Sequence, residues 1–149
     1  MATAIRRADA HWHGALTTGT GEVSLESGAC GPLGISWPAR VEDPNGQTSP
    51  EELLAAAQAA CFAMAFTAVL GREARHPERL DVNVAISLDP AEHGGFKVSR
   101  SHITVHAVVG GIDEETFQDL ADEARTGCPV SAAFQGNVEI TIDATMTTP

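Results

Sequence analysis

The chain has 149 residues, a length typical of one globular domain that needs neither disulfides nor a metal to bury a core. Its 9 Lys and Arg against 20 Asp and Glu give a net charge of −11, which disfavours nucleic acids and anionic membranes as partners because phosphate groups are bound by concentrated positive charge. Hydrophobic residues at 43% and charged residues at 19% argue against a disordered chain. We therefore expect a single folded domain over residues 1–149.

The N-terminal segment and the cysteines indicate a cytoplasmic protein. Arg6 and Arg7 are not followed by an apolar run, so neither a secretory signal nor a transit peptide is expected. The cysteines, Cys30, Cys61 and Cys128, are odd in number and include no C-x-x-C pair, a pattern that fits neither a secreted disulfide framework nor a zinc ribbon. In a reducing compartment such cysteines fill the core, catalyse a reaction or undergo redox chemistry.

The first third of the chain has the pattern of short strands. Residues 10–27 predict a β-hairpin, because apolar residues alternate with polar ones on both sides of a Thr-Gly-Thr-Gly turn. A third strand is expected near residues 34–37, followed by a polar loop through residues 38–46.

A long apolar helix follows this loop. Ser49 can be its N-cap, Pro50 its first residue, and Glu52 can close a capping box. The eighteen residues 53–70 carry no formal charge and eight of them are Ala, so the helix is apolar on every side and must be covered on every side.

Two environments could cover such a helix, a bilayer or other protein. Gln58 and Thr67 interrupt the apolar run, and alanine contributes little to membrane insertion, so a membrane span is disfavoured. Alanines spaced four residues apart would let a second helix approach closely. Since the chain has one helix of this kind, the expected partner is the same helix of a second copy.

The C-terminal half alternates strands and helices. Strict alternation predicts a strand over residues 80–88, and a change of phase in the strand from residue 96 to 109 requires a bulge near Arg100 and Ser101. Asp113 should cap a helix that Gly127 ends, Cys128 and Pro129 should begin a short helix, and residues 138–144 should form the last strand. The expected order is β-β-β-α-β-β-α-α-β, an α+β fold.

Peroxide reduction by a thiol needs a thiolate, a cation that keeps it ionised, and a second thiol that resolves the sulfenic acid. Cys61 and Cys128 could form such a pair, although two buried hydrophobic side chains are an equally good interpretation of composition alone.

Longer motifs are more specific. The run Ser-Pro-Glu-Glu-Leu-Leu-Ala-Ala-Ala-Gln-Ala-Ala-Cys-Phe-Ala-Met-Ala over residues 49–65 and the run Gly-Cys-Pro-Val-Ser over residues 127–131 resemble the osmotically inducible protein C and organic hydroperoxide resistance family. The segments Ala-His-Trp-His-Gly at residues 10–14 and Arg-Val-Glu at residues 40–42, together with residues 21–28, resemble its osmotically inducible branch.

This resemblance implies a fold, an activity and four site residues. The family fold is an intertwined homodimer with antiparallel sheets wrapped around long central helices, and its members are peroxidases that reduce organic hydroperoxides, and hydrogen peroxide more weakly. By position, Cys61 matches the peroxide-attacking cysteine, Cys128 the resolving cysteine, Arg40 the arginine before the central helix and Glu51 the glutamate ahead of the attacking cysteine. The family binds no cofactor, and its reductant is a dithiol of the dihydrolipoyl type.

Elementary geometry adds to what the resemblance implies. Ten helical residues rise about 15 Å, so Glu51 cannot reach Cys61 of its own helix, and a shared site must draw Glu51 from the other subunit. Arg40 can bind a carboxylate through two nitrogens and direct a remaining N–H at sulfur or at the peroxide oxygen. A helix N-terminus should make Cys128 the more acidic thiol, whereas an apolar helix should raise the pKa of Cys61, so Arg40 must outweigh that burial if Cys61 attacks first.

Other residues of the long helix, and the third cysteine, lie outside the matched site positions. Apolar side chains expected to supply a substrate pocket are Leu53, Phe62, Met64 and Phe66, although each could equally be core. Gln58 stands where many relatives carry His or an aromatic residue, and an amide cannot shuttle a proton by titrating. Cys30 matches no functional cysteine of the family.

Three alternatives compete with the peroxidase. A cysteine hydrolase would pair a thiol with a histidine, and a transition-metal site could use alternating strand histidines; the candidates for both are His11, His13, His102 and His106. Nothing local supports the hydrolase, which would also need an oxyanion hole for acyl transfer. Alternating histidines on strands are usually surface residues, so we expect no metal. A non-enzymatic apolar-ligand binder or structural dimer could keep the fold, but it would need neither Cys61 nor Cys128.

Overall fold

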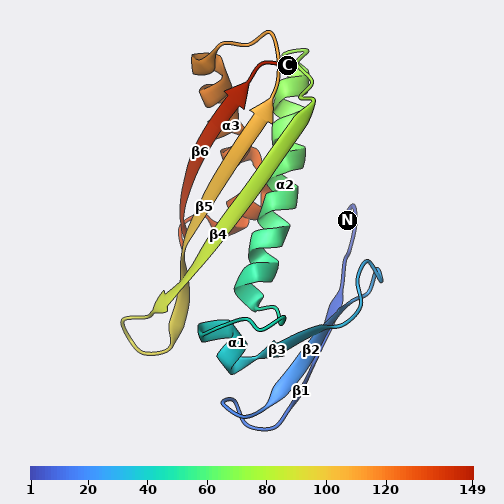
Figure 1. The fold of residues 1–149 in the computed structure, drawn as a ribbon, viewed down its shortest axis with the longest axis vertical. Helices are drawn as coiled ribbons and strands as arrows, with labels where there is room; N and C mark the ends of the chain where they lie inside the picture. Colours follow the sequence, from blue (N-terminus) through green and yellow to red (C-terminus); the bar gives the residue numbers. More distant parts are fainter. The chain divides into compact units, whose positions relative to one another are not determined.

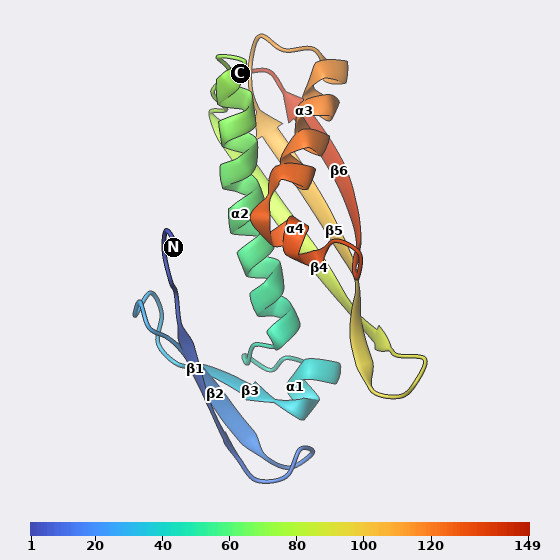
Figure 2. The same cartoon turned by 180° about the vertical axis from the view of Figure 1, so that it is seen from behind.

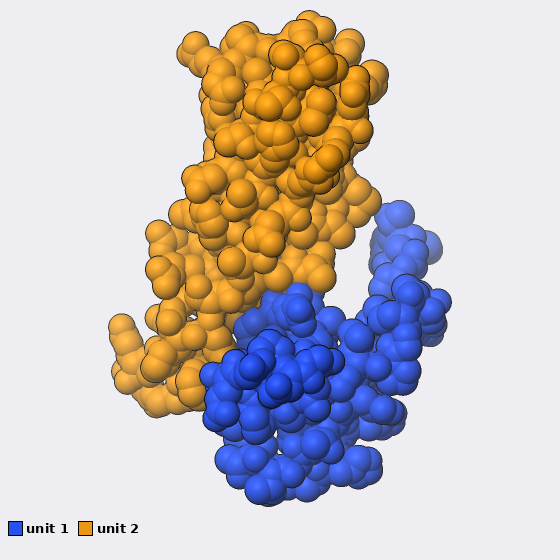
Figure 3. Space-filling model, viewed as in Figure 1, with its two compact units in different colours: residues 1–53 blue, residues 54–149 orange.

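The computed structural model describes all residues, Met1–Pro149, as two compact units, residues 1–53 and 54–149 (Figure 3). Whether the whole chain behaves as the single domain expected over residues 1–149 stays a prediction.

The first unit holds a three-stranded antiparallel sheet in the order β1-β2-β3, formed by β1 (Ala8–His13), β2 (Thr20–Leu25) and β3 (Leu33–Ser36) (Figure 1). The expected hairpin and third strand are therefore confirmed. Gly21 is required where β1 and β2 pair, because a Cβ there would lie 2.4 Å from the carbonyl oxygen of His11.

A short helix, α1 (Trp37–Val41), occupies the start of the segment expected to be a polar loop. Ser36 caps it, with its hydroxyl accepting from the Ala39 N–H at 3.3 Å, and Pro38 lies in its first turn. Both are ordinary helix-start signals. The loop interpretation was wrong because five residues are too few to show helical periodicity, so the cap was the only signal available.

The long helix, α2 (Pro50–Arg72), begins where expected and extends two residues beyond the apolar run. Ser49 Oγ accepts from the Glu52 N–H at 3.1 Å, which confirms the N-cap, while the Glu52 carboxylate accepts from the Thr48 hydroxyl at 2.6 Å. The helix is long and apolar enough to cross a bilayer, yet only 28% of its most apolar stretch is buried within one chain. The expected cover on every side is thus present on one side alone.

The second unit is built on a mixed sheet in the order β4-β5-β6. Strand β5 (Phe96–Val108) pairs antiparallel with β4 (Arg79–Pro90) and parallel with β6 (Glu139–Thr147), so this sheet is not purely antiparallel as expected. The parallel pair follows from the two helices between β5 and β6, which carry the chain back to the same end of the sheet.

The expected bulge is confirmed close to its predicted position. Ser87 pairs with Arg100 and Leu88 with Val98, which leaves Ser99 as the extra residue of β5. The extra residue shifts the alternation of side chains between the two faces of the sheet. Beyond it every second side chain of β5 is buried, and this buried row consists of Ser101, Ile103, Val105 and Ala107.

Helices α3 (Glu114–Gly127) and α4 (Pro129–Phe134) lie with the second unit's part of α2 on one face of the sheet (Figures 1 and 2). Asp113 caps α3 and Cys128 occupies the N-cap position of α4, as expected. The core between helices and sheet is formed by buried apolar side chains, including Phe62, Phe66, Leu70, Ile103, Val105 and Phe117. The full order is β-β-β-α-α-β-β-α-α-β, an α+β fold with one short helix more than predicted.

Candidate active site

Cys61 and Cys128 lie beside each other in the second unit. Cys61 is on α2 and half-buried, while Cys128 is fully buried at the junction of α3 and α4. The side chains interact directly, each affecting the ionisation of the other. Residues far apart in the chain are therefore brought together in the way that a redox pair requires.

The two thiols differ in acidity in the direction that helix position predicts. Burial raises the pKa of the Cys61 thiol, and the neighbouring Cys128 raises it further, against a smaller opposite effect of the Val130 N–H. For Cys128, burial also acts to raise the pKa, but hydrogen bonding with Cys61 and with the backbone and hydroxyl of Ser131 outweighs it, and the net pKa is lowered. In the isolated chain the thiolate is favoured at Cys128.

A buried polar chain adjoins Cys128. Gln58 Nε2 donates to Ser131 Oγ at 3.1 Å, and Ser101 Oγ donates to Gln58 Oε1 at 2.6 Å. Sequence reasoning assigned no role to these two serines. Their shared signal is weak, since Ser101 is one polar residue in an otherwise apolar buried row and Ser131 follows Cys128 by three residues in a helix start.

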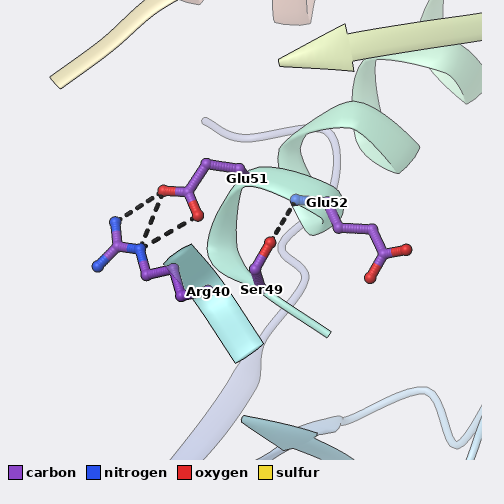
Figure 4. Close-up of polar contacts among 4 residues, drawn as sticks. All are labelled: Arg40, Ser49, Glu51 and Glu52. Atoms are coloured by element: carbon purple, nitrogen blue, oxygen red, sulfur yellow. Dashed lines mark hydrogen bonds and ion pairs between the residues drawn. The ribbon is translucent and has the colours of Figure 1, made fainter. Parts of the chain in front are cut away.

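In the first unit, Arg40 and Glu51 form a bidentate ion pair (Figure 4). Arg40 Nη2 lies 2.7 Å from Glu51 Oε1, and Arg40 Nε lies 3.2 and 3.1 Å from the two carboxylate oxygens. The Glu51 side chain is 10% exposed and that of Arg40 32% exposed. Helix α1 positions the arginine and the first turn of α2 the glutamate, and the Nη1 group of Arg40 is not used by the pair.

The four expected pocket residues have different surroundings. Phe62 and Phe66 are fully buried and pack in a row with Phe117 as tilted rings, with centroids 5.6 and 5.4 Å apart. Met64 is 68% exposed and Leu53 is half-buried. Their role as a pocket wall stays a prediction.

An open groove of about 570 Å³ runs between α2 and α3 in the second unit. The ion pair between Arg72 and Glu123 lies at its border, and Gly127, the residue before Cys128, belongs to its lining. None of the four expected pocket residues lines this groove.

In the second unit, the histidines of β5 lie away from the buried core. His102 and His106 alternate with the buried row of β5 and so lie on the opposite face of the sheet, where their Nδ1 atoms are 2.8 and 3.1 Å from the hydroxyls of Thr141 and Thr145. His102 Nε2 also lies 3.2 Å from Asp143. No cluster of three or more His, Cys, Asp or Glu side chains able to hold a metal is present in the structure. Cys30 is exposed.

Comparison with known proteins decides the family. A family model described as OsmC-like protein matches residues 43–143. The Escherichia coli protein named peroxiredoxin OsmC is 38% identical over 138 residues, which cover 93% of this chain and 94% of that protein. The chain belongs to the OsmC-like family. This confirms the resemblance seen in its cysteine motifs.

Other OsmC-like proteins agree in sequence and in structure. An organic hydroperoxide resistance protein of Xanthomonas axonopodis is 32% identical over 96 residues, covering 64% of this chain and 65% of that protein. The crystal structure of OhrB of Bacillus subtilis superposes with a TM-score of 0.74 at 27% identity, covering 93% and 97% of the two chains. An OsmC structure from Legionella pneumophila gives a TM-score of 0.75 at 26% identity over 99% and 100%. The OsmC-like fold is thus confirmed over nearly the whole chain.

Proposed function

We propose that this OsmC-like chain is a thiol-dependent peroxidase that reduces organic hydroperoxides to alcohols and, more weakly, hydrogen peroxide to water. The contact between Cys61 and Cys128 is the observation that carries the proposal, since neither an apolar-ligand binder nor a structural dimer needs it. Relatives named peroxiredoxin and organic hydroperoxide resistance protein support the same activity.

The reaction has three steps. The Cys61 thiolate attacks one peroxide oxygen, so that an S–O bond forms, the O–O bond breaks, and the departing alkoxide takes a proton to become the alcohol. The Cys128 thiolate then attacks the Cys61 sulfenic acid, an S–S bond forms, and the oxygen leaves as water after taking a proton. An external dithiol, of the dihydrolipoyl type, returns the disulfide to two thiols by exchange. No cofactor takes part, and a reducing cytoplasm supplies the conditions.

The cation for the first step is Arg40. Its bidentate bond to Glu51 fixes the guanidinium and leaves Nη1 to face the sulfur or the developing alkoxide. Because α2 is one continuous helix and ten helical residues span about 15 Å, Glu51 and its arginine serve the thiols of a second protomer. The catalytic unit is therefore a homodimer.

The uncovered side of α2 supports this assembly. Exposed or half-exposed small and apolar residues recur there at helical spacing; they are Ala56, Ala57, Ala60, Ala63, Met64 and Gly71. An apolar stripe of this kind is stabilised when a matching surface covers it, and a second α2 offers one.

The test is a count of free thiols after oxidation. In a Cys30→Ser variant, which removes the exposed third thiol, cumene hydroperoxide should consume two thiols per chain and hydrogen peroxide should do so more slowly. Intact mass should show a disulfide that a dihydrolipoyl compound reduces.

Two cysteine variants serve as controls. Adding Cys61→Ser should abolish thiol consumption, whereas adding Cys128→Ser should allow one turnover and then leave Cys61 as a sulfenic or higher acid. If the thiol content of the reduced Cys30→Ser protein is unchanged after both oxidants, the proposed function is wrong.

A further inference from the structure

Three buried polar side chains of the second unit form a hydrogen-bonded chain that ends beside Cys128. Ser101 Oγ donates to Gln58 Oε1 at 2.6 Å, and Gln58 Nε2 donates to Ser131 Oγ at 3.1 Å. Gln58 and Ser101 are fully buried and Ser131 is 4% exposed. Buried polar groups cost stability unless each is bonded, and apolar side chains would fill this space without that requirement.

The direction of the donors is set by the amide of Gln58. Ser131 is the third residue of the helix whose N-cap position is Cys128, and its backbone and hydroxyl both act to lower the pKa of the Cys128 thiol. The Ser131 oxygen accepts from Gln58, so its own proton is free for the Cys128 sulfur. In the structure the amide presents Nε2 to Ser131 and Oε1 to Ser101, so Ser131 accepts from Gln58 and Ser101 donates to it.

We propose that Gln58 and Ser131 are positioning residues that supply Cys128 with a hydroxyl donor and so prepare its thiolate for the resolving step. This inference rests on the peroxidase function proposed above. An amide does not titrate, so the donor stays oriented over the whole working pH range, whereas an imidazole at the same place would change its donors near neutral pH. Ser101 acts through Gln58.

The resolving step competes with a second oxidation. When Cys61 is a sulfenic acid, the Cys128 thiolate attacks its sulfur, the S–S bond forms and water leaves. A second hydroperoxide can instead transfer an oxygen to the sulfenic sulfur, which yields a sulfinic acid and another alcohol. The ratio of disulfide to sulfinic acid therefore measures how well Cys128 is prepared.

The first experiment isolates Cys128. In a Cys30→Ser/Cys61→Ser background, thiolate absorbance is followed against pH, with and without Ser131→Ala. Removing the hydroxyl should move the midpoint to higher pH and lower the thiolate fraction below the midpoint about tenfold, the usual effect of losing a hydrogen bond to a charged group. Gln58→Glu should raise the midpoint as well, because a carboxylate takes the Ser131 proton.

The second experiment measures the competition with Cys61 present and Cys30→Ser as the parent. Ser131→Ala and Gln58→Met should slow disulfide formation and raise the fraction of sulfinic acid, while the first step does not slow. The matched control is Thr126→Ala, which removes a hydroxyl bonded only to carbonyls of its own helix and should change neither readout. Thermal melting by circular dichroism verifies that each variant folds.

The outcomes separate the two proposals. If the folded Ser131→Ala and Gln58→Glu variants keep the parent's Cys128 titration and its disulfide yield, the positioning role is wrong even though the peroxidase stands. If the parent itself consumes no thiols with hydroperoxide, the proposed function fails, whereas the Cys128 titration still decides whether Ser131 donates to the sulfur.

Discussion

At the scale of single residues, the ion pair between Arg40 and Glu51 has a geometry that lysine could not reproduce. The guanidinium uses Nε and Nη2 for the carboxylate and retains Nη1, whereas an ammonium group is a single point donor. Within the second unit the pKa of Cys61 is raised, chiefly by burial, so an external cation must favour its thiolate if Cys61 attacks first.

We predict that Arg40→Ala moves the pH midpoint of Cys61 alkylation upward and lowers the thiolate at neutral pH about tenfold or more, because an opposite charge within ionic contact lowers a thiol pKa by one unit or more. Arg40→Lys should recover part of this effect. The matched control is Arg79→Ala, which breaks an exposed arginine–aspartate pair and should leave the alkylation curve unchanged. Identical curves for Arg40→Ala and the parent would reject the role.

The sequence predicts some residues of the site but not the contacts between them. Arg40, Glu51, Cys61 and Cys128 can be singled out because each lies in a motif that resembles a family pattern. The partners of Gln58 cannot, because they lie 43 and 73 residues away and their contact depends on how β5 and α4 pack against α2. Sequence periodicity describes a residue's own element and contains no information on such pairings.

At the scale of elements, the residues at helix starts explain why α2 and α3 were predicted and why the short helix α1 was not. Asp113 precedes an amphipathic helix, so cap and periodicity agree there, and Ser49 precedes a long run of uncharged apolar residues. Ser36 precedes only five helical residues, which are too few to show helical periodicity, so the sequence predicted a polar loop where α1 lies. The bulge at Ser99 was predictable because an alternation that changes phase needs an extra residue, and it is this residue that brings Ser101 into the buried row.

The cap of α3 should be sensitive to acid. The Thr116 backbone N–H, followed by the Thr116 hydroxyl, holds the pKa of Asp113 below its ordinary value, and the Thr116 nitrogen lies 2.9 Å from Asp113 Oδ1. A carboxyl whose pKa is lower in the folded than in the unfolded state stabilises the fold above its unfolded pKa, about 3.9, and loses this contribution as the pH falls through the folded pKa.

We therefore predict that Asp113→Asn melts at a lower temperature than the parent near neutral pH and that the difference shrinks as the pH falls below about 4, since an asparagine cap accepts the same bond without titrating. Asp119→Asn, an exposed carboxylate farther along α3, is the control and should not show this pattern. A difference in melting temperature that is constant from neutral pH into acid would contradict the prediction.

At the scale of the whole molecule, α2 is the feature that one chain leaves incomplete. Its inner side carries Phe62, Phe66 and Leu70 into the core, while Met64 and Ala60 stay exposed. Composition alone predicts that the helix must be covered, and only the fold shows which side lacks cover, because a helix that is apolar all round has no preferred face in its sequence.

We predict that Met64→Glu shifts the protein from the proposed dimer to monomer in sedimentation experiments, since a buried unpaired carboxylate in the apolar stripe is costly. Peroxidase turnover should fall with dimer content if Arg40 acts across the interface. The control is Thr104→Glu, which adds the same charge on the outer face of the sheet and should leave the dimer intact. A Met64→Glu protein that sediments as the parent does would exclude this helix face as the interface.

The meeting of Cys61 and Cys128 across 67 positions (128 − 61) also bears on how the molecule withstands unfolding. A bond between the two sulfurs would close a large loop and remove about 4 kcal/mol of conformational entropy from the denatured chain. Each turnover would then pass through a disulfide-bonded form that melts at a higher temperature and resists proteolysis better than the reduced protein. The chain would therefore resist unfolding most while it is being oxidised. The dithiol that restores its reactivity would also remove this extra stability by reducing the disulfide.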